Sequence, residues 1–212
     1  MKSFNTLSKK TLVAIAIAAS VPMLAHAESN FVTGAGSLTA TARLDFQITI
    51  PRVLFLQVGT GTAGANNTTI DLVTFTPTAA QIAAGTAGIV AATNGTVAAK
   101  LIGNGGTINL TATTAGQLTT GTAGENISWA QIVPSTSLPG FPHPALVDGP
   151  AAGAISAYGS AAAKVTNLSA NWTFVFNAPA IPPAAGVYGG AGAASPGAGI
   201  RNGRVLYTAV MP

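Results

Sequence analysis

The chain has 212 residues, of which 48% are hydrophobic and only 7% are charged. Ordinary globular proteins have about 25% charged residues, so neutral polar groups must solvate most of this surface. Three of the nine basic residues lie within the first 27, which leaves six bases against five acids and a net charge of +1 beyond them. This balance excludes a basic stripe for nucleic acid, and the lack of cysteine means that the fold forms without disulfides.

The first 27 residues have the three parts of a secretory signal peptide. Lysines precede an apolar stretch over residues 12–24, which ends at Ala25-His26-Ala27, a pattern typical of a cleavage site. The apolar stretch is shorter than the roughly 20 residues that a membrane-spanning helix needs. We therefore expect cleavage after Ala27, export of the protein, and no transmembrane segment in the mature chain.

Beyond the signal peptide, the sequence predicts β-strands and almost no helix. The clearest pattern alternates Leu44, Phe46, Ile48 and Ile50 with polar residues, which is typical of a half-buried strand. Several strands separated by Gly, Asn and Pro indicate one all-β domain, either an antiparallel sandwich or a barrel. The predicted strands span residues 38–50, 52–58, 69–75, 96–102, 107–113, 126–133, 164–176 and 203–211, and a short helical turn is expected at 78–84.

Asn104-Gly105-Gly106 lies between two of these predicted strands. Asn-Gly pairs favour the tight turns of β-hairpins, in which both central residues have a positive φ. The sequence therefore predicts that strands 96–102 and 107–113 pair with each other as a hairpin.

The sequence offers few groups that could carry out catalysis. His143 is the only histidine beyond the signal peptide, and its place between two prolines predicts an exposed loop residue. The acids are scattered singly, so we expect no metal site, no cofactor and no enzymatic activity. Trp129 and Trp172 lie on predicted strands, where aromatic side chains usually pack in the core.

The C-terminal region resembles a known family. The stretch Ala185-Gly186-Val187-Tyr188-Gly189-Gly190 and the later Gly203-Arg204-Val205-Leu206-Tyr207-Thr208 are similar to the closing hairpin of subunits of chaperone-usher fimbriae. The signal peptide, chain length and Thr/Ala/Gly/Val content are also similar to those of that family, in its cysteine-free branch. The resemblance implies an immunoglobulin-like sandwich that lacks its last strand, and a function as a structural subunit of a surface appendage.

In that family, the N-terminal extension of a neighbour completes the sandwich by β-strand addition. The resemblance implies an extension over residues 28–42, a single domain over residues 43–212, and a donor strand within residues 31–42. It also implies that the partners are copies of the chain or related subunits, with a periplasmic chaperone and an usher, and that the protein reaches the cell surface through the periplasm. The expected donor residues are Leu38, Ala40 and Ala42, and the expected groove residues are Val205, Tyr207, Ala209 and Met211.

Two other functions remain open from the sequence. A secreted carbohydrate-binding or surface-binding module would need exposed aromatic side chains, for which Phe141, Tyr158 and Tyr188 are the candidates. A small outer-membrane barrel would also have alternating strands, but its two aromatic girdles would need more than the 6% aromatic residues found here.

Overall fold

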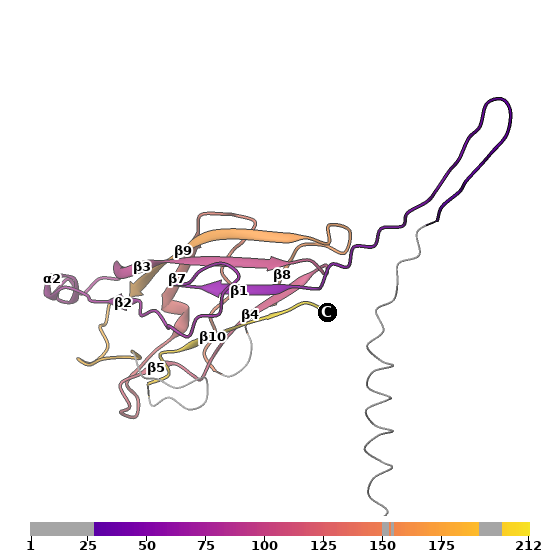
Figure 1. Ribbon diagram of the computed structural model, residues 1–212. Helices are drawn as coiled ribbons and strands as arrows, with labels where there is room; N and C mark the ends of the chain where they lie inside the picture. Colours follow the sequence, from indigo (N-terminus) through magenta and orange to yellow (C-terminus); the bar gives the residue numbers. More distant parts are fainter. Residues whose placement is uncertain (1–27, 150–152, 154, 191–200) are drawn as a thin grey trace, which may run out of the picture. The chain divides into compact units, whose positions relative to one another are not determined.

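The computed structural model describes residues 28–149, 153, 155–190 and 201–212 (Figure 1). The predicted signal peptide and its cleavage site after Ala27 lie outside the described residues. The chain divides into two units, Met1–Ile50 and Pro51–Pro212. The second unit contains all the strands of the described residues, and every strand pair in it is antiparallel. The prediction of an all-β fold is therefore confirmed.

A five-stranded sheet has the order β1-β3-β9-β7, with the short β2 also paired to β3. A three-stranded sheet has the order β10-β4-β8, and β5 pairs with β6. The bounds are β1 Leu54–Val58, β2 Thr74–Phe75, β3 Gly88–Gly103, β4 Ile108–Thr114, β5 Leu118–Thr119, β6 Asn126–Ile127, β7 Ile132–Thr136, β8 Ser156–Tyr158, β9 Thr166–Ala178 and β10 Val205–Val210.

The two longest strands, β3 and β9, pair at the centre of the larger sheet. Its register runs from Gly88 opposite Ala178 to Gly103 opposite Thr166, with one irregularity between Ala91 and Thr96. Asn94 lies at that irregularity and has a φ of 55°. A bulge of this kind accommodates a residue in the left-handed region, which asparagine tolerates better than most side chains.

The turn at residues 104–107 does not form the predicted hairpin. β3 belongs to the larger sheet and β4 to the smaller one, so the turn carries the chain from one sheet to the other. Gly106 has a φ of 111°, whereas Asn104 is not among the residues with positive φ, so a type I′ turn is excluded. The hairpin prediction is wrong because the glycines permit a sharp change of direction but do not determine which strands pair.

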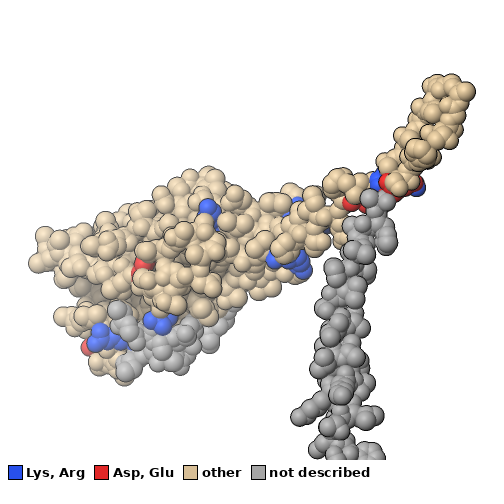
Figure 2. Space-filling view, viewed as in Figure 1, with Lys and Arg blue, Asp and Glu red and all other residues tan. Residues whose placement is uncertain are grey.

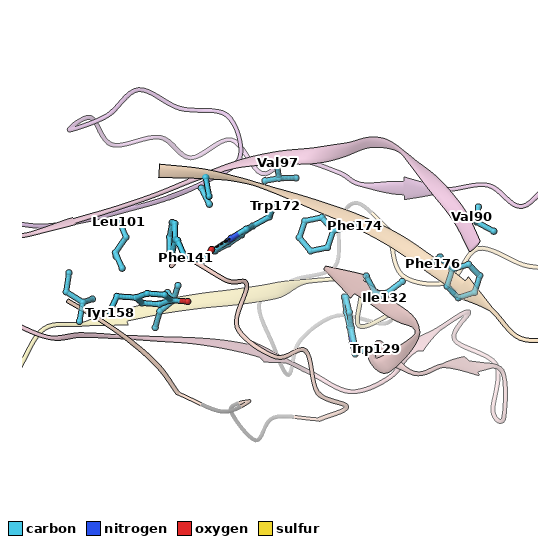
Figure 3. Packing of buried hydrophobic residues seen from close by; sticks show 14 of the residues in the cluster. Val90, Val97, Leu101, Trp129, Ile132, Phe141, Tyr158, Trp172, Phe174 and Phe176 are labelled. Carbon is cyan, nitrogen blue, oxygen red and sulfur yellow. Dashed lines mark hydrogen bonds between the residues drawn. The ribbon is translucent and has the colours of Figure 1, made fainter. Parts of the chain in front are cut away.

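Side chains from both sheets meet in one core (Figure 3). Core-facing residues of β3, β4 and β9 are almost fully buried, among them Leu101, Leu110 and Trp172, each with 0% exposure. Trp129 is also buried, so the prediction that both tryptophans pack in the core is confirmed. The ring centroids of Trp172 on β9 and Tyr207 on β10 lie 5.7 Å apart, which places the two sheets against each other.

The described part of the first unit, residues 28–50, has no strand. Here the structure differs from the predicted strand at 38–50, because the alternating pattern is present but no neighbouring strand supplies hydrogen bonds. Residues 43–50, which the sequence analysis placed in the domain, belong to this unit. Arg43 Nε lies 2.6 Å from Glu28 Oε2, and this ion pair holds the pKa of Glu28 below its ordinary value.

The predicted helical turn is confirmed as α2, Ala79–Ala83. The Thr78 side chain accepts a hydrogen bond from the Gln81 N–H, and the Gln81 side chain accepts one from the Thr78 N–H, which makes a capping box. Over the described residues, no helix is long and apolar enough to cross a membrane.

Candidate assembly site

On one side of the core, each sheet ends in an edge strand whose outer edge pairs with no other strand of the described residues. β1 is the last strand of the larger sheet and β10 is the last strand of the smaller one, and no strand of the described residues pairs with their outer edges. Arg52, just before β1, donates hydrogen bonds to the backbone oxygens of Met211 and Pro212, just after β10, at 3.3 and 2.6 Å. The start of β1 therefore lies beside the end of β10, and the two strands run in opposite directions (Figure 1).

We call the outer edges of β1 and β10, with their core-facing side chains, the open edge. Directly opposed residues in an antiparallel pair share one face of the sheet, so the buried residues of β3 and β4 identify these side chains. On β1, Leu56 lies opposite Leu101 and Val58 lies opposite Ala99. On β10, the core-facing residues are Val205, Tyr207 and Ala209, which lie opposite Thr114, Ala112 and Leu110.

These core-facing side chains are only partly buried, although their partners on β3 and β4 are buried almost completely. A hollow of about 160 Å³ also borders β1, and it is lined by the consecutive residues Phe55–Val58 and by the segment that follows β1, from Thr60 to Thr69. Consecutive residues point to alternate faces, so they line one hollow together only along the free edge of their strand. The core-facing side chains of β1 and β10 are thus incompletely covered.

The opposite side of the core is closed by the segment that follows β7. Phe141 and Pro144 in this segment are fully buried. The Phe141 carbonyl accepts hydrogen bonds from Thr136 Oγ1 of β7 and from Trp172 Nε1 of β9, at 3.0 and 3.1 Å. The Tyr158 hydroxyl of β8 donates to the Pro142 carbonyl at 2.6 Å. A single segment therefore joins β7 to β8, whereas the described contacts that join β1 to β10 lie at one end, where Arg52 and the Asn104–Gly105 turn meet the residues after β10.

His143 belongs to this closing segment and is not the exposed loop residue that the sequence predicted. Its ring lies against Trp172, Phe174 and Tyr207, with centroid distances of 4.7, 5.1 and 5.4 Å. Its Nε2 lies 2.7 Å from the Tyr207 hydroxyl. Burial lowers the pKa of His143 to about 4 and raises the pKa of Tyr207 above its ordinary value. The flanking prolines suggested a loop correctly, but the loop runs through the core.

The four predicted groove residues lie together at the open edge. Val205, Tyr207 and Ala209 face the core from β10, and Met211 follows the strand and also packs against the core. Leu56 and Val58 border the same edge from β1, and they are not among the residues predicted from the sequence. The apolar run in residues 53–56 predicted their strand, but nothing in it indicated which strand neighbours β10.

The three predicted donor residues, Leu38, Ala40 and Ala42, are exposed in the first unit. Larger apolar side chains follow them in the same unit. Leu44, Phe46, Ile48 and Ile50 have exposures of 66%, 86%, 86% and 76%. The sequence analysis recognised this alternation but assigned it to the domain, so it overlooked these residues as candidates for assembly.

The remaining chemistry of the described residues is sparse. None of their His, Asp and Glu side chains form a group of three that could hold a metal ion. Phe141 and Tyr158 are buried, with 0% and 4% exposure, so they cannot form the exposed aromatic cluster that a carbohydrate-binding module would need. Comparisons with protein-family models, with curated proteins and with solved structures found no match to this chain.

Proposed function

We propose that this protein is an exported structural subunit of a fimbria-like surface appendage, in which copies are joined by β-strand addition at the open edge. The domain is then an incomplete immunoglobulin-like sandwich, and the first unit supplies the missing strand to a neighbour. The low charge suits such a subunit, because few ionic groups must be desolvated when its surface packs against another copy. On the face drawn in Figure 2, charged side chains are few and scattered.

The observation that carries this proposal is the asymmetry of the core. The β7 and β8 side is closed by a segment that contributes the buried Phe141, whereas the core-facing side chains of β1 and β10 stay partly exposed. Two unpaired edges that flank exposed apolar side chains offer both backbone hydrogen bonds and side-chain pockets to an added strand.

The proposal extends to the route of assembly. A subunit with an open edge would aggregate in the periplasm unless another protein covered that edge. We therefore expect a periplasmic chaperone that occupies the β1 and β10 edges and an usher that exchanges it for the next subunit. The final location is the cell surface.

Electron microscopy and light scattering of the exported protein test the proposed function. The whole chain is expressed in a bacterial host, and the processed product is purified and also refolded from denaturant at high concentration. We expect an N-terminus at Glu28 and linear multimers that grow with concentration. A folded monomer at every concentration, before and after refolding, would overturn the proposal.

A further inference from the structure

We propose that Leu44–Ile50 of one copy is the strand that fills the open edge of a second copy of this chain, running antiparallel to β10. This inference rests on the proposed function and identifies the donor segment, the partner and the direction. It differs from the donor expected from the sequence, which centres on Leu38, Ala40 and Ala42.

The first argument is the exposed apolar face of this segment. Leu44, Phe46, Ile48 and Ile50 are 66–86% exposed, and a run of four large alternating side chains is costly to leave in water. The intervening Asp45, Gln47 and Thr49 are polar and suit the outer face of a sheet. Ala40 and Ala42, by contrast, carry too little side chain to fill pockets between two sheets.

The second argument is that the apolar residues of Leu44–Ile50 have the same spacing as the core-facing residues of β10. The core-facing positions on and after β10 are Val205, Tyr207, Ala209 and Met211, four residues that recur every second position. The segment also presents four residues at every second position, from Leu44 to Ile50. A strand in register with β10 therefore places one donor side chain beside each core-facing residue.

The third argument concerns direction. In the antiparallel register, Phe46 lies beside Ala209, so the bulkiest donor side chain meets the smallest residue of the edge, as close packing favours. Ile50 then lies beside Val205, and the donor's own domain follows at that end of the acceptor. The parallel register would bring the donor's domain to the Met211 end, where Arg52 holds the acceptor's own chain.

The fourth argument is that the segment cannot readily fill the edge of its own domain. Residues 51–53 are held at the start of β1, since Asn104 accepts from the Val53 N–H at 2.7 Å and donates to the Pro51 carbonyl at 2.8 Å. To lie antiparallel to its own β10, Leu44–Ile50 would end beside Val205, and these three residues would have to reverse direction and run back along the whole of β10 to the start of β1. A second copy imposes no such reversal.

Engineered cysteines test the register directly, because the natural chain has none. The whole chain carrying both Phe46→Cys and Ala209→Cys is purified, oxidised with glutathione disulfide and run on a denaturing gel without reductant. Directly opposed side chains on neighbouring strands are close enough for a disulfide. We expect a ladder of covalent multimers that collapses to one band after reduction.

Two matched variants serve as controls. Gln47→Cys with Ala209→Cys places the donor cysteine on the outer face, and we expect no ladder. Ala40→Cys with Ala209→Cys tests the donor expected from the sequence, and a ladder from this pair alone would overturn the inference. A covalent monomer from the Phe46→Cys pair would also overturn it, by showing that the strand fills its own domain. Multimers that form without any cross-link would overturn the register and leave the proposed function standing, whereas the absence of multimers would remove both.

Discussion

At the scale of single residues, His143 has the most unusual surroundings. A histidine between two prolines usually lies in solvent, but here three aromatic rings surround it and its Nε2 pairs with the Tyr207 hydroxyl. Tyr207 belongs to β10, so His143 links the segment that closes one side of the core to the strand that borders the open edge. Its charge state therefore affects the stability of the whole domain.

Stability should rise with pH between about 4 and 6.5. The pKa of His143 is about 4 in the folded protein and about 6.5 when it is exposed, so within this window the unfolded state binds the extra proton. The contribution is complete above pH 6.5, and on the order of 3 kcal/mol is lost as the pH falls to 4. Thermal melts of the protein at each pH would measure it.

The variant His143→Gln provides the control for this prediction. It removes the only histidine beyond residue 27, so the rise in melting temperature between pH 4 and 6.5 should flatten. If the variant kept the slope of the natural protein, the carboxylates would be responsible and the assignment to His143 would be wrong.

At the scale of elements, the sequence predicted some strands well, missed others, and did not predict which strands are neighbours. The alternating pattern predicted the bounds of β4, β9 and β10 to within about two residues, because a strand with one buried face has an apolar residue at every second position. The pattern cannot say which strands pair, and so the turn at Asn104 was interpreted as a hairpin although it joins two sheets.

Only the β10 part of the candidate site could be predicted, because alternation locates a strand but does not identify its neighbours. Val205, Tyr207 and Ala209 were identified from their alternation and from the resemblance to fimbrial subunits. The position of β1 beside β10 depends on tertiary contacts such as those of Arg52 with Met211 and Pro212, which lie about 160 residues away in the chain. The exposure of Leu44–Ile50 was also hidden, because an alternating segment looks the same whether its partner strand belongs to its own chain or to another.

The variant Phe46→Ala should weaken assembly. It removes most of an aromatic side chain that we place beside Ala209 in the neighbouring copy, and burial of a phenylalanine is worth about 1.5–3 kcal/mol. Because each 1.4 kcal/mol is a factor of ten, the critical concentration for multimers should rise roughly 10-fold to 100-fold. Sedimentation over a range of concentrations would measure it.

Gln47→Ala is the matched control, since Gln47 lies on the outer face of the same segment. Its critical concentration should stay within about threefold of that of the natural chain, as expected for a surface substitution. Equal effects from the two variants would mean that the segment contributes no defined face to assembly.

At the scale of the whole molecule, the scarcity of charge predicts that assembly depends little on salt. Only 7% of the residues are charged, and none of the core-facing residues of the open edge is among them, nor are Leu44, Phe46, Ile48 and Ile50. Screening acts on exposed charges, so it has little to act on here. Raising sodium chloride from about 50 to 500 mM, which shortens the screening length several-fold, should change the critical concentration less than about threefold. A change of tenfold or more would indicate that ion pairs hold the copies together.

The proposed direction of the donor strand also determines the form of the assembly. In this direction, the domain of the donor copy follows its strand at the Val205 end of the acceptor. The N-terminal extension of the acceptor copy leaves its domain near Arg52, at the Met211 end. Such a head-to-tail contact uses two different surfaces and, where the rotation does not close a ring, generates an open filament. The same geometry predicts that a copy with a defective donor segment still accepts a strand from a neighbour. A copy with a blocked open edge should likewise still donate its own strand.

The most direct test of this account is to mix two defective variants of the whole chain, Phe46→Glu in the donor segment and Ala209→Glu at the open edge. A charge at either position would be buried without a partner, so each variant alone should remain monomeric. The mixture should form a dimer with one copy of each, in which the intact Leu44–Ile50 of the Ala209→Glu chain fills the intact edge of the Phe46→Glu chain. Native mass spectrometry of folded variants would contradict the account if the mixture stayed monomeric, or if either variant formed multimers by itself.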